Sequence, residues 1–214
     1  MKRGIIVTIL LLSSILLMAC SNNKEGDQVP DHTGSADSDI RAVFDTVCSA
    51  DEALALAKKT DTVVLESRGC ASGNDVWDTF YQTVAGGKPA AVLCAHYYTL
   101  DPEHMSEELY EEEKDRYPVL YFYLVEYDGK EYTVTTRESA AEAPESQETY
   151  QHLLHLTGDA PSTARYASYD NYVLVDDPDV TWENLMAGMF SSQSDAWIRH
   201  CTVYRNYFGW KGNA

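Results

Sequence analysis

Residues 118–137 read PVLYFYLVEYDGKEYTVTTR, and this stretch decides the fold class. Two runs rich in β-branched and aromatic residues, Pro118–Tyr127 and Lys130–Arg137, flank the dipeptide Asp128-Gly129. An Asp-Gly pair between such runs is the strongest short-range signal for a β-hairpin. The stretch therefore predicts two neighbouring antiparallel strands.

The two faces of the first predicted strand differ in composition, because side chains alternate across a strand. One face carries Leu120, Phe122 and Leu124, which we assign to the core. The opposite face carries Val119, Tyr121, Tyr123, Val125 and Tyr127. Tyrosine favours strands for packing reasons alone, so half-buried packing is one interpretation of this face. If helices leave the face open, it is instead an aromatic platform for a glycan or peptide, with Tyr121, Tyr123 and Tyr127 as candidate ligand-binding residues.

Further elements are expected on both sides of this hairpin. Strands are predicted at 62–66, 91–98 and 198–208. A second hairpin is predicted, with strands Arg165–Tyr169 and Tyr172–Val175 and a turn at Asp170-Asn171. Helices are predicted at 51–59, from a cap at Ser72 through Val84, at 146–157 ahead of Gly158, and at 181–190 after Asp179. The sum is an α+β fold: an antiparallel sheet with helices packed on it.

The N-terminus has the composition of an export signal. Lys2 and Arg3 precede an apolar run from Ile5 to Met18. At 1.5 Å per residue the run spans about 21 Å, which is short for a transmembrane helix and typical of a signal peptide. The run ends in Leu17-Met18-Ala19-Cys20, which resembles the lipobox of bacterial lipoprotein precursors.

The lipobox resemblance implies that residues 1–19 are removed and that Cys20 carries a diacylglyceryl group. Two acyl chains anchor a protein stably, so the mature chain is expected at the extracytoplasmic face of the cell membrane, attached through the lipid. An ordinary signal peptide with a chance cysteine is the alternative.

The chain after Cys20 divides into a tether and a folded part. Residues 20–39 are almost entirely polar and cannot bury enough apolar surface to order themselves, so we predict a disordered tether. Residues 40–214 have the length of one domain. The sequence has 34 acidic and 16 basic side chains, a net charge of −18. Nucleic acid is therefore a poor candidate partner, because binding phosphates requires a basic surface.

Four residues form the set most similar to a metal site: Glu145, Glu148, His152 and His155. On the helix predicted at 146–157 they would share an arc of about 80°, and carboxylates and imidazoles bind Zn²⁺. They lie away from the apolar side of that helix, so a solvated polar face is the favoured interpretation. A zinc site at His152 and His155 is the alternative, and no cofactor is otherwise expected.

The remaining cysteines are Cys48, Cys70, Cys94 and Cys201. In an extracytoplasmic protein they could form disulfides in any of three connectivities, or remain free. None has metal-ligand spacing, and nothing in the sequence indicates a nucleophile with its base.

The body also resembles small uncharacterised lipoproteins of Gram-positive bacteria. The shared features are the Tyr127–Tyr132 hairpin (YDGKEY), a Trp/Phe helix ending in glycine, and Ser191-Ser192. This resemblance implies no activity. From the lipobox and the aromatic face of the strand at 118–127, we expect a membrane-anchored binding or interaction module for a glycan, peptide or protein. An envelope enzyme, such as a metal-assisted hydrolase, is the alternative.

Overall fold

The hairpin around Asp128-Gly129 is confirmed by the computed structural model, which describes residues 33–211. Strands β4 (Val119–Tyr127) and β5 (Tyr132–Glu138) pair antiparallel from Tyr127 opposite Tyr132 to Tyr121 opposite Glu138. The Asp128 Oδ1 atom accepts hydrogen bonds from the backbone N–H groups of Lys130 and Glu131. Gly129 has a φ of 100°, a conformation that few other residues adopt.

The sheet has nine strands in the order β6-β5-β4-β3-β1-β2-β9-β8-β7. The strands not yet defined are β1 (Thr62–Glu66), β2 (Gly69–Ser72), β3 (Ala90–Tyr98), β6 (Ser146–Tyr150), β7 (His152–Asp159), β8 (Ser168–Val175) and β9 (His200–Phe208). Neighbouring strands are antiparallel except for the parallel pair β1 and β3. The single-domain α+β class is therefore confirmed, although the sheet is mixed rather than wholly antiparallel.

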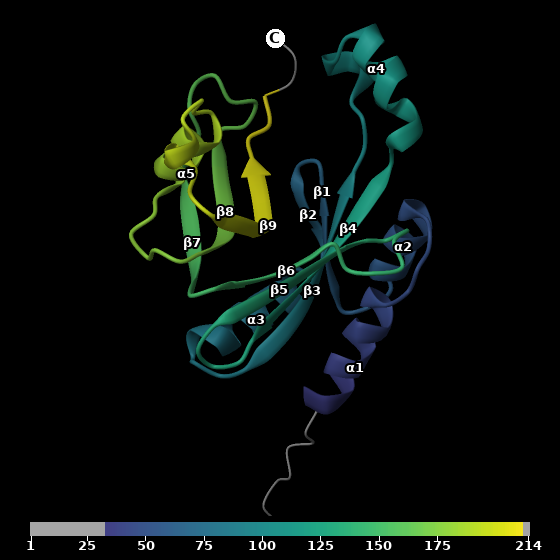
Figure 1. Ribbon diagram of the computed structural model, residues 1–214, viewed down its shortest axis with the longest axis vertical. Helices are drawn as coiled ribbons and strands as arrows, with labels where there is room; N and C mark the ends of the chain where they lie inside the picture. Colours follow the sequence, from purple (N-terminus) through teal and green to yellow (C-terminus); the bar gives the residue numbers. More distant parts are fainter. Residues whose placement is uncertain (1–32, 212–214) are drawn as a thin grey trace, which may run out of the picture. The chain divides into compact units, whose positions relative to one another are not determined.

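Strands β6 and β7 are the two edges of the sheet, yet only Gln151 separates them in the chain. Figure 1 shows the chain turning sharply from β6 into β7. Edges joined by one residue must lie close together, so the sheet bends back on itself. One core cluster accordingly contains Val134 of β5 and Tyr150 of β6 together with Leu174 of β8 and Tyr204 of β9.

The helices cover different parts of this bent sheet. Helices α1 (Thr33–Phe44) and α2 (Ala50–Ala57) pack on the face of β4 that carries Leu120, Phe122 and Leu124, as the sequence predicted for the core side. Helix α3 (Asn74–Ala85) contributes Trp77, Phe80 and Val84 to the cluster shared by the two halves of the sheet. Helix α5 (Trp182–Met189) packs on Val173 and Val175 of β8.

Between β3 and β4 the chain forms short helical segments that bury no side chain: η1 (Pro102–His104), α4 (Glu107–Glu113) and η2 (Lys114–Arg116). A further short segment, η3 (Ser194–Ala196), precedes β9.

Two of the predicted elements are wrong. The helix expected at 146–157 is instead β6 and β7. Leu153 and Leu154 suggested a helix because they are adjacent, but β7 packs on both faces: Leu153 contacts the shared cluster and Leu154 contacts the cluster under α5. The hairpin expected at 165–175 is instead the continuous strand β8, in which Asn171 is fully buried opposite Arg205.

For most other elements the observed first and last residues lie within two residues of the predicted ones. The N-terminus of α3 is an exception, because the residue that caps it is not the predicted one. Ser72 lies in β2, and Gly73 caps α3 with a φ of 83°. A Cβ atom at Gly73 would lie 2.6 Å from the carbonyl oxygen of Thr62, so this tight turn requires glycine.

Helix α1 begins at Thr33, so residues 33–39, which we expected in the tether, are helical. The signal peptide, Cys20 and the remainder of the tether lie outside the described residues.

The buried guanidinium of Arg137 joins α1 to the end of β5. It donates to the carbonyl oxygens of Phe44 and Thr46, at the C-terminal end of α1, and of Ala141 beyond β5. Its charge also lies over the rings of Phe44 and Phe122. Burial lowers the pKa of Arg137, and the carbonyl oxygens compensate by solvating its charge.

Replacing Arg137 with methionine should lower the free energy of unfolding by about 3 kcal/mol or more, because several buried carbonyl oxygens lose their donor together. Denaturant titration of the full chain measures this effect. The control is Arg165→Met at an exposed position, which should change stability by less than about 0.5 kcal/mol. Equal effects of the two substitutions would contradict this role of Arg137.

Candidate functional site

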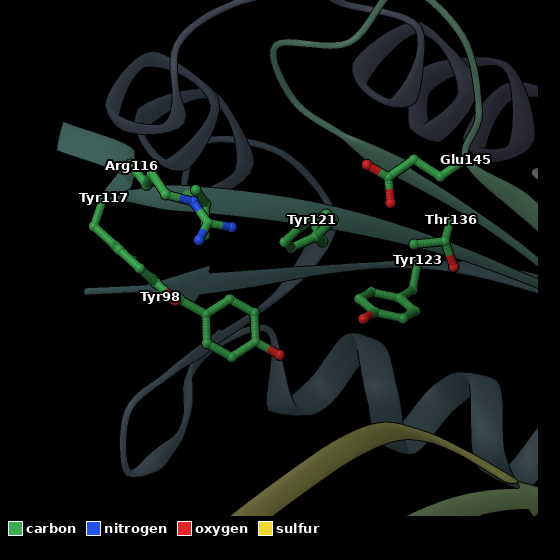
Figure 2. A pocket seen from close by; sticks show the side chains of 8 residues that line it. Tyr98, Arg116, Tyr117, Tyr121, Tyr123, Thr136 and Glu145 are labelled. Atoms are coloured by element: carbon green, nitrogen blue, oxygen red, sulfur yellow. The ribbon is translucent and has the colours of Figure 1, made fainter. Parts of the chain in front are cut away.

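A hollow of about 350 Å³ lies on the face of β4 opposite α1 and α2 (Figure 2). We call it the tyrosine pocket. Four of its lining residues are tyrosines, and the full lining is Tyr98, Arg116, Tyr117, Val119, Tyr121, Tyr123, Thr136 and Glu145. The volume falls within the range usual for small-ligand sites.

Strand register brings most of these side chains together. Tyr121 and Tyr123 share one face of β4, and Thr136 of β5 lies directly opposite Tyr123. The backbone N–H of Glu145 donates to the carbonyl oxygen of Thr136 at 2.8 Å, which places Glu145 beside β5. Tyr98, the last residue of β3, pairs with Val119. Arg116 and Tyr117 come from the segment that leads into β4.

The pocket carries opposite charges at different places. In Figure 2 the Arg116 guanidinium points into the hollow on the side of Tyr117 and Tyr98, and the Glu145 carboxylate points in from the side of Thr136. Arg116 forms an ion pair with Glu113 at 2.9 Å, and its side chain is 73% exposed. No described residue forms an ion pair or side-chain hydrogen bond with the Glu145 carboxylate, so this end of the pocket presents an unpaired negative charge.

A buried histidine supports the aromatic floor. His96 is 1% exposed, and its ring lies 4.3 Å from that of Tyr123, centroid to centroid. Its Nε2 atom lies 3.2 Å from the carbonyl oxygen of Val203, and its Nδ1 atom 3.4 Å from the Tyr98 hydroxyl. A carbonyl oxygen only accepts, so Nε2 carries the hydrogen and the Tyr98 hydroxyl donates to Nδ1. Burial, and next the charge of Arg205, lower the pKa of His96 to about 3, which keeps it neutral.

The pocket phenols are suited to binding rather than to proton transfer. Burial raises the pKa of Tyr121, with further contributions from Glu138 and Glu145, and burial is also the main cause of the raised pKa of Tyr123. Both phenols are therefore neutral near pH 7 and available as hydrogen-bond donors and acceptors. The described lining contains no serine, cysteine or histidine that could act as a nucleophile or base.

The structure places the predicted tyrosines in two environments. Tyr121 and Tyr123 line the pocket, whereas Tyr127 stacks on Tyr132 at 4.5 Å between ring centroids and is not part of the lining. The sequence indicated no site role for Tyr98, Arg116, Tyr117 or Thr136, and it indicated a metal site rather than this pocket for Glu145. The predicted strands placed Tyr98 at one strand end and Thr136 within another, but which residues meet depends on strand register, which the sequence does not reveal.

The four candidate metal ligands are not arranged as the predicted helix required. His152 and His155 are three residues apart on β7 and so point to opposite faces. His155 Nε2 lies 2.7 Å from Asp170 Oδ1, and its ring stacks on Tyr172. Glu148 accepts from the Tyr150 hydroxyl, and Glu145 lies in the tyrosine pocket. Within residues 33–211, no group of three or more His, Cys, Asp or Glu side chains could hold a metal ion.

The four cysteines in the described part of the chain are free thiols. Cys94 is fully buried, and Cys70 and Cys201 pack against the same core cluster. Burial raises the pKa of Cys70 and of Cys94, and raises that of Cys201 to about 12. These three thiols are therefore poor nucleophiles at neutral pH.

The comparisons with known proteins add no relative. No protein-family model, curated protein or solved structure matches the chain. Among the described helices, none combines the length and apolar character needed to cross a membrane. The geometry of the pocket is therefore the only support for assigning a functional site to the described residues.

Replacing His96 with glutamine should reduce the loss of stability at acidic pH. The folded-state pKa of His96 is lowered from 6.5 to about 3, so its protonation favours the unfolded chain as the pH falls through this interval. In the wild type, protonation of His96 in the unfolded chain should lower the free energy of unfolding by about 2 kcal/mol at pH 5 relative to pH 8. The His96→Gln variant should lack this loss. Denaturant titration at both pH values measures this difference.

The matched control is His152→Gln on edge strand β7, which should leave the pH dependence of stability nearly unchanged. An identical pH dependence in wild type and His96→Gln would show that His96 is not held neutral in the fold.

Proposed function

We propose that this chain is a lipid-anchored extracytoplasmic binding module whose ligand occupies the tyrosine pocket. The observation that carries the proposal is the convergence of four tyrosines from three segments of the chain on one open hollow. An arginine and a glutamate enter the same hollow (Figure 2). Apolar surface with a few convergent polar groups is the usual composition of a small-ligand site.

Aromatic side chains favour binding because they bury a large area and lose little conformational entropy. The phenol hydroxyls add directional hydrogen bonds, and Thr136 adds another hydroxyl at the edge of the floor. This chemistry suits recognition of a small ligand better than catalysis. For the envelope-enzyme alternative, the two histidines that could hold a metal, His152 and His155, point to opposite faces of β7 and so do not form a site together.

The lipid anchor is supported by the sequence. The apolar run from Ile5 to Met18 has the length of a signal peptide, and Leu17-Met18-Ala19-Cys20 follows the lipobox pattern. A diacylated Cys20 would hold the folded part at the membrane through hydrocarbon, without a membrane-spanning segment.

Replacing Cys20 with alanine should release the chain from membranes, because no thiol is then present to receive the diacylglyceryl group. Membrane fractionation measures the release, and mass spectrometry of the wild-type N-terminal peptide should show an acylated Cys20 with residues 1–19 absent. The control is Cys48→Ala, which should stay membrane-bound. An unmodified Cys20, or retention of residues 1–19, would contradict the anchor.

Replacing Tyr121 with alanine should weaken ligand binding about tenfold, the effect of losing about 1.4 kcal/mol of aromatic contact. Saturation-transfer NMR with the full mature chain in detergent micelles would screen neutral trisaccharides and tripeptides with free termini. Calorimetry would then measure the affinity of each ligand found.

The control for this measurement is Tyr127→Ala, because Tyr127 lies on the same strand outside the pocket. It should change affinity less than about twofold. Absence of binding by every probe, or equal losses for Tyr121→Ala and Tyr127→Ala, would contradict the proposed site.

A further inference from the structure

We infer that the tyrosine pocket selects a zwitterionic ligand, a short peptide with both termini free, with its carboxylate toward Arg116 and its ammonium toward Glu145. This inference rests on the proposed function, since it concerns the same pocket. Two observations carry it. Opposite charges enter the hollow (Figure 2), and a second arginine, Arg205, lies against Tyr98 without an ion-pair partner among the described residues.

Arg116 is free to bind a carboxylate without losing its present partner. Both of its hydrogen bonds to Glu113 come from one terminal nitrogen, Nη1. A guanidinium has five N–H donors in a planar fork, so Nε and Nη2 remain available to a second carboxylate. The existing ion pair is exposed and three residues apart on the chain, and such pairs hold a side chain only weakly.

Arg205 adds a second positive charge near the same side of the pocket. Its guanidinium carbon lies 5.4 Å from the centroid of the Tyr98 ring, and Figure 2 shows Tyr98 on the side of the pocket that Arg116 enters. Within the described part of the chain, Arg205 has no ion-pair or hydrogen-bond partner. A half-buried arginine without a carboxylate is unusual in so acidic a chain, and it makes this side of the pocket favourable for an anion.

Glu145 gives the other side the opposite preference. Its backbone is held to Thr136, whereas its carboxylate points into the hollow. Burial and then the charge of Glu138 are the larger causes of the raised pKa of Tyr121, and the charge of Glu145 adds to them, so the Glu145 carboxylate acts on the pocket. An ammonium group at this position would gain both the carboxylate and the faces of the neighbouring tyrosines.

A zwitterion satisfies these charges better than either simple ion. Arg116 keeps its ion pair with Glu113 whatever the ligand, but a cation alone would leave Arg205 uncompensated, and an anion alone would leave Glu145 uncompensated. The chain's net charge of −18 also slows the approach of anions. A ligand with separated opposite charges matches the local potential at both ends, which gives orientation and specificity.

The test uses four forms of the tripeptide Ala-Tyr-Ala: both termini free, N-acetylated, C-amidated and blocked at both ends. Calorimetry with the full mature chain in detergent micelles measures their affinities. The free form should bind at least tenfold more tightly than either singly blocked form, and the doubly blocked form should bind most weakly.

Substitutions should remove one preference at a time. Glu145→Gln should weaken the free and C-amidated forms about tenfold and leave the N-acetylated form unchanged. Arg116→Gln and Arg205→Gln should weaken the free and N-acetylated forms and leave the C-amidated form unchanged. The matched controls Glu142→Gln and Arg165→Gln, at exposed positions outside the lining, should change none of these affinities.

The outcomes separate this inference from the proposed function. Equal binding of all four peptides, or binding of a neutral trisaccharide but no peptide, with loss in Tyr121→Ala, would overturn the zwitterion and keep the binding site. Failure of all peptides and saccharides to bind would overturn both.

Discussion

The connection from β6 to β7 constrains the rest of the structure. These strands are the opposite edges of a nine-stranded sheet, and Gln151 alone joins them. The backbone N–H of Gln151 donates to Val175 in β8, and Arg199 bridges the junction by donating to Asp176 and to the carbonyl oxygen of Thr149. A flat sheet of this order could not be joined by one residue, because adjacent strands are about 4.8 Å apart. The sheet must therefore bend until its halves share a core.

The bend also builds the candidate site. Strands β3 and β9 are separated by β1 and β2 in the sheet order, yet they touch. His96 of β3 donates to the Val203 carbonyl of β9, and Arg205 of β9 lies against Tyr98 of β3. The contact buries His96, orients the Tyr98 hydroxyl and brings an unpaired positive charge to the tyrosine pocket. The aromatic floor and its charge are thus consequences of the same closure.

Features that depend on the local residue pattern could be predicted from the sequence. Features that depend on the bending of the sheet, which brings its two halves together, could not. The Asp128-Gly129 hairpin, the core face with Phe122, and the position of Tyr121 and Tyr123 together on the opposite face follow from turn chemistry and alternation. Strand β7 was misread because closure gives it two packed faces, which removes the alternation that identifies a strand. Arg116, Glu145 and Tyr98 could not be assigned together, because the sequence does not reveal the register and bend that bring them to one hollow.

The pocket also shows why the charge of the whole chain does not determine its ligand. The net charge is −18, which predicts a preference for cations at long range. At physiological ionic strength, exposed charges are largely screened beyond about 8 Å. A ligand in the hollow therefore experiences mainly the nearby charges, which are those of Arg116 with its partner Glu113, Arg205, Glu145 and Glu138. The low-dielectric tyrosine rings strengthen these nearby interactions. The acidic surface governs approach and solubility, and the side chains around the hollow govern which charges are accepted once the ligand arrives.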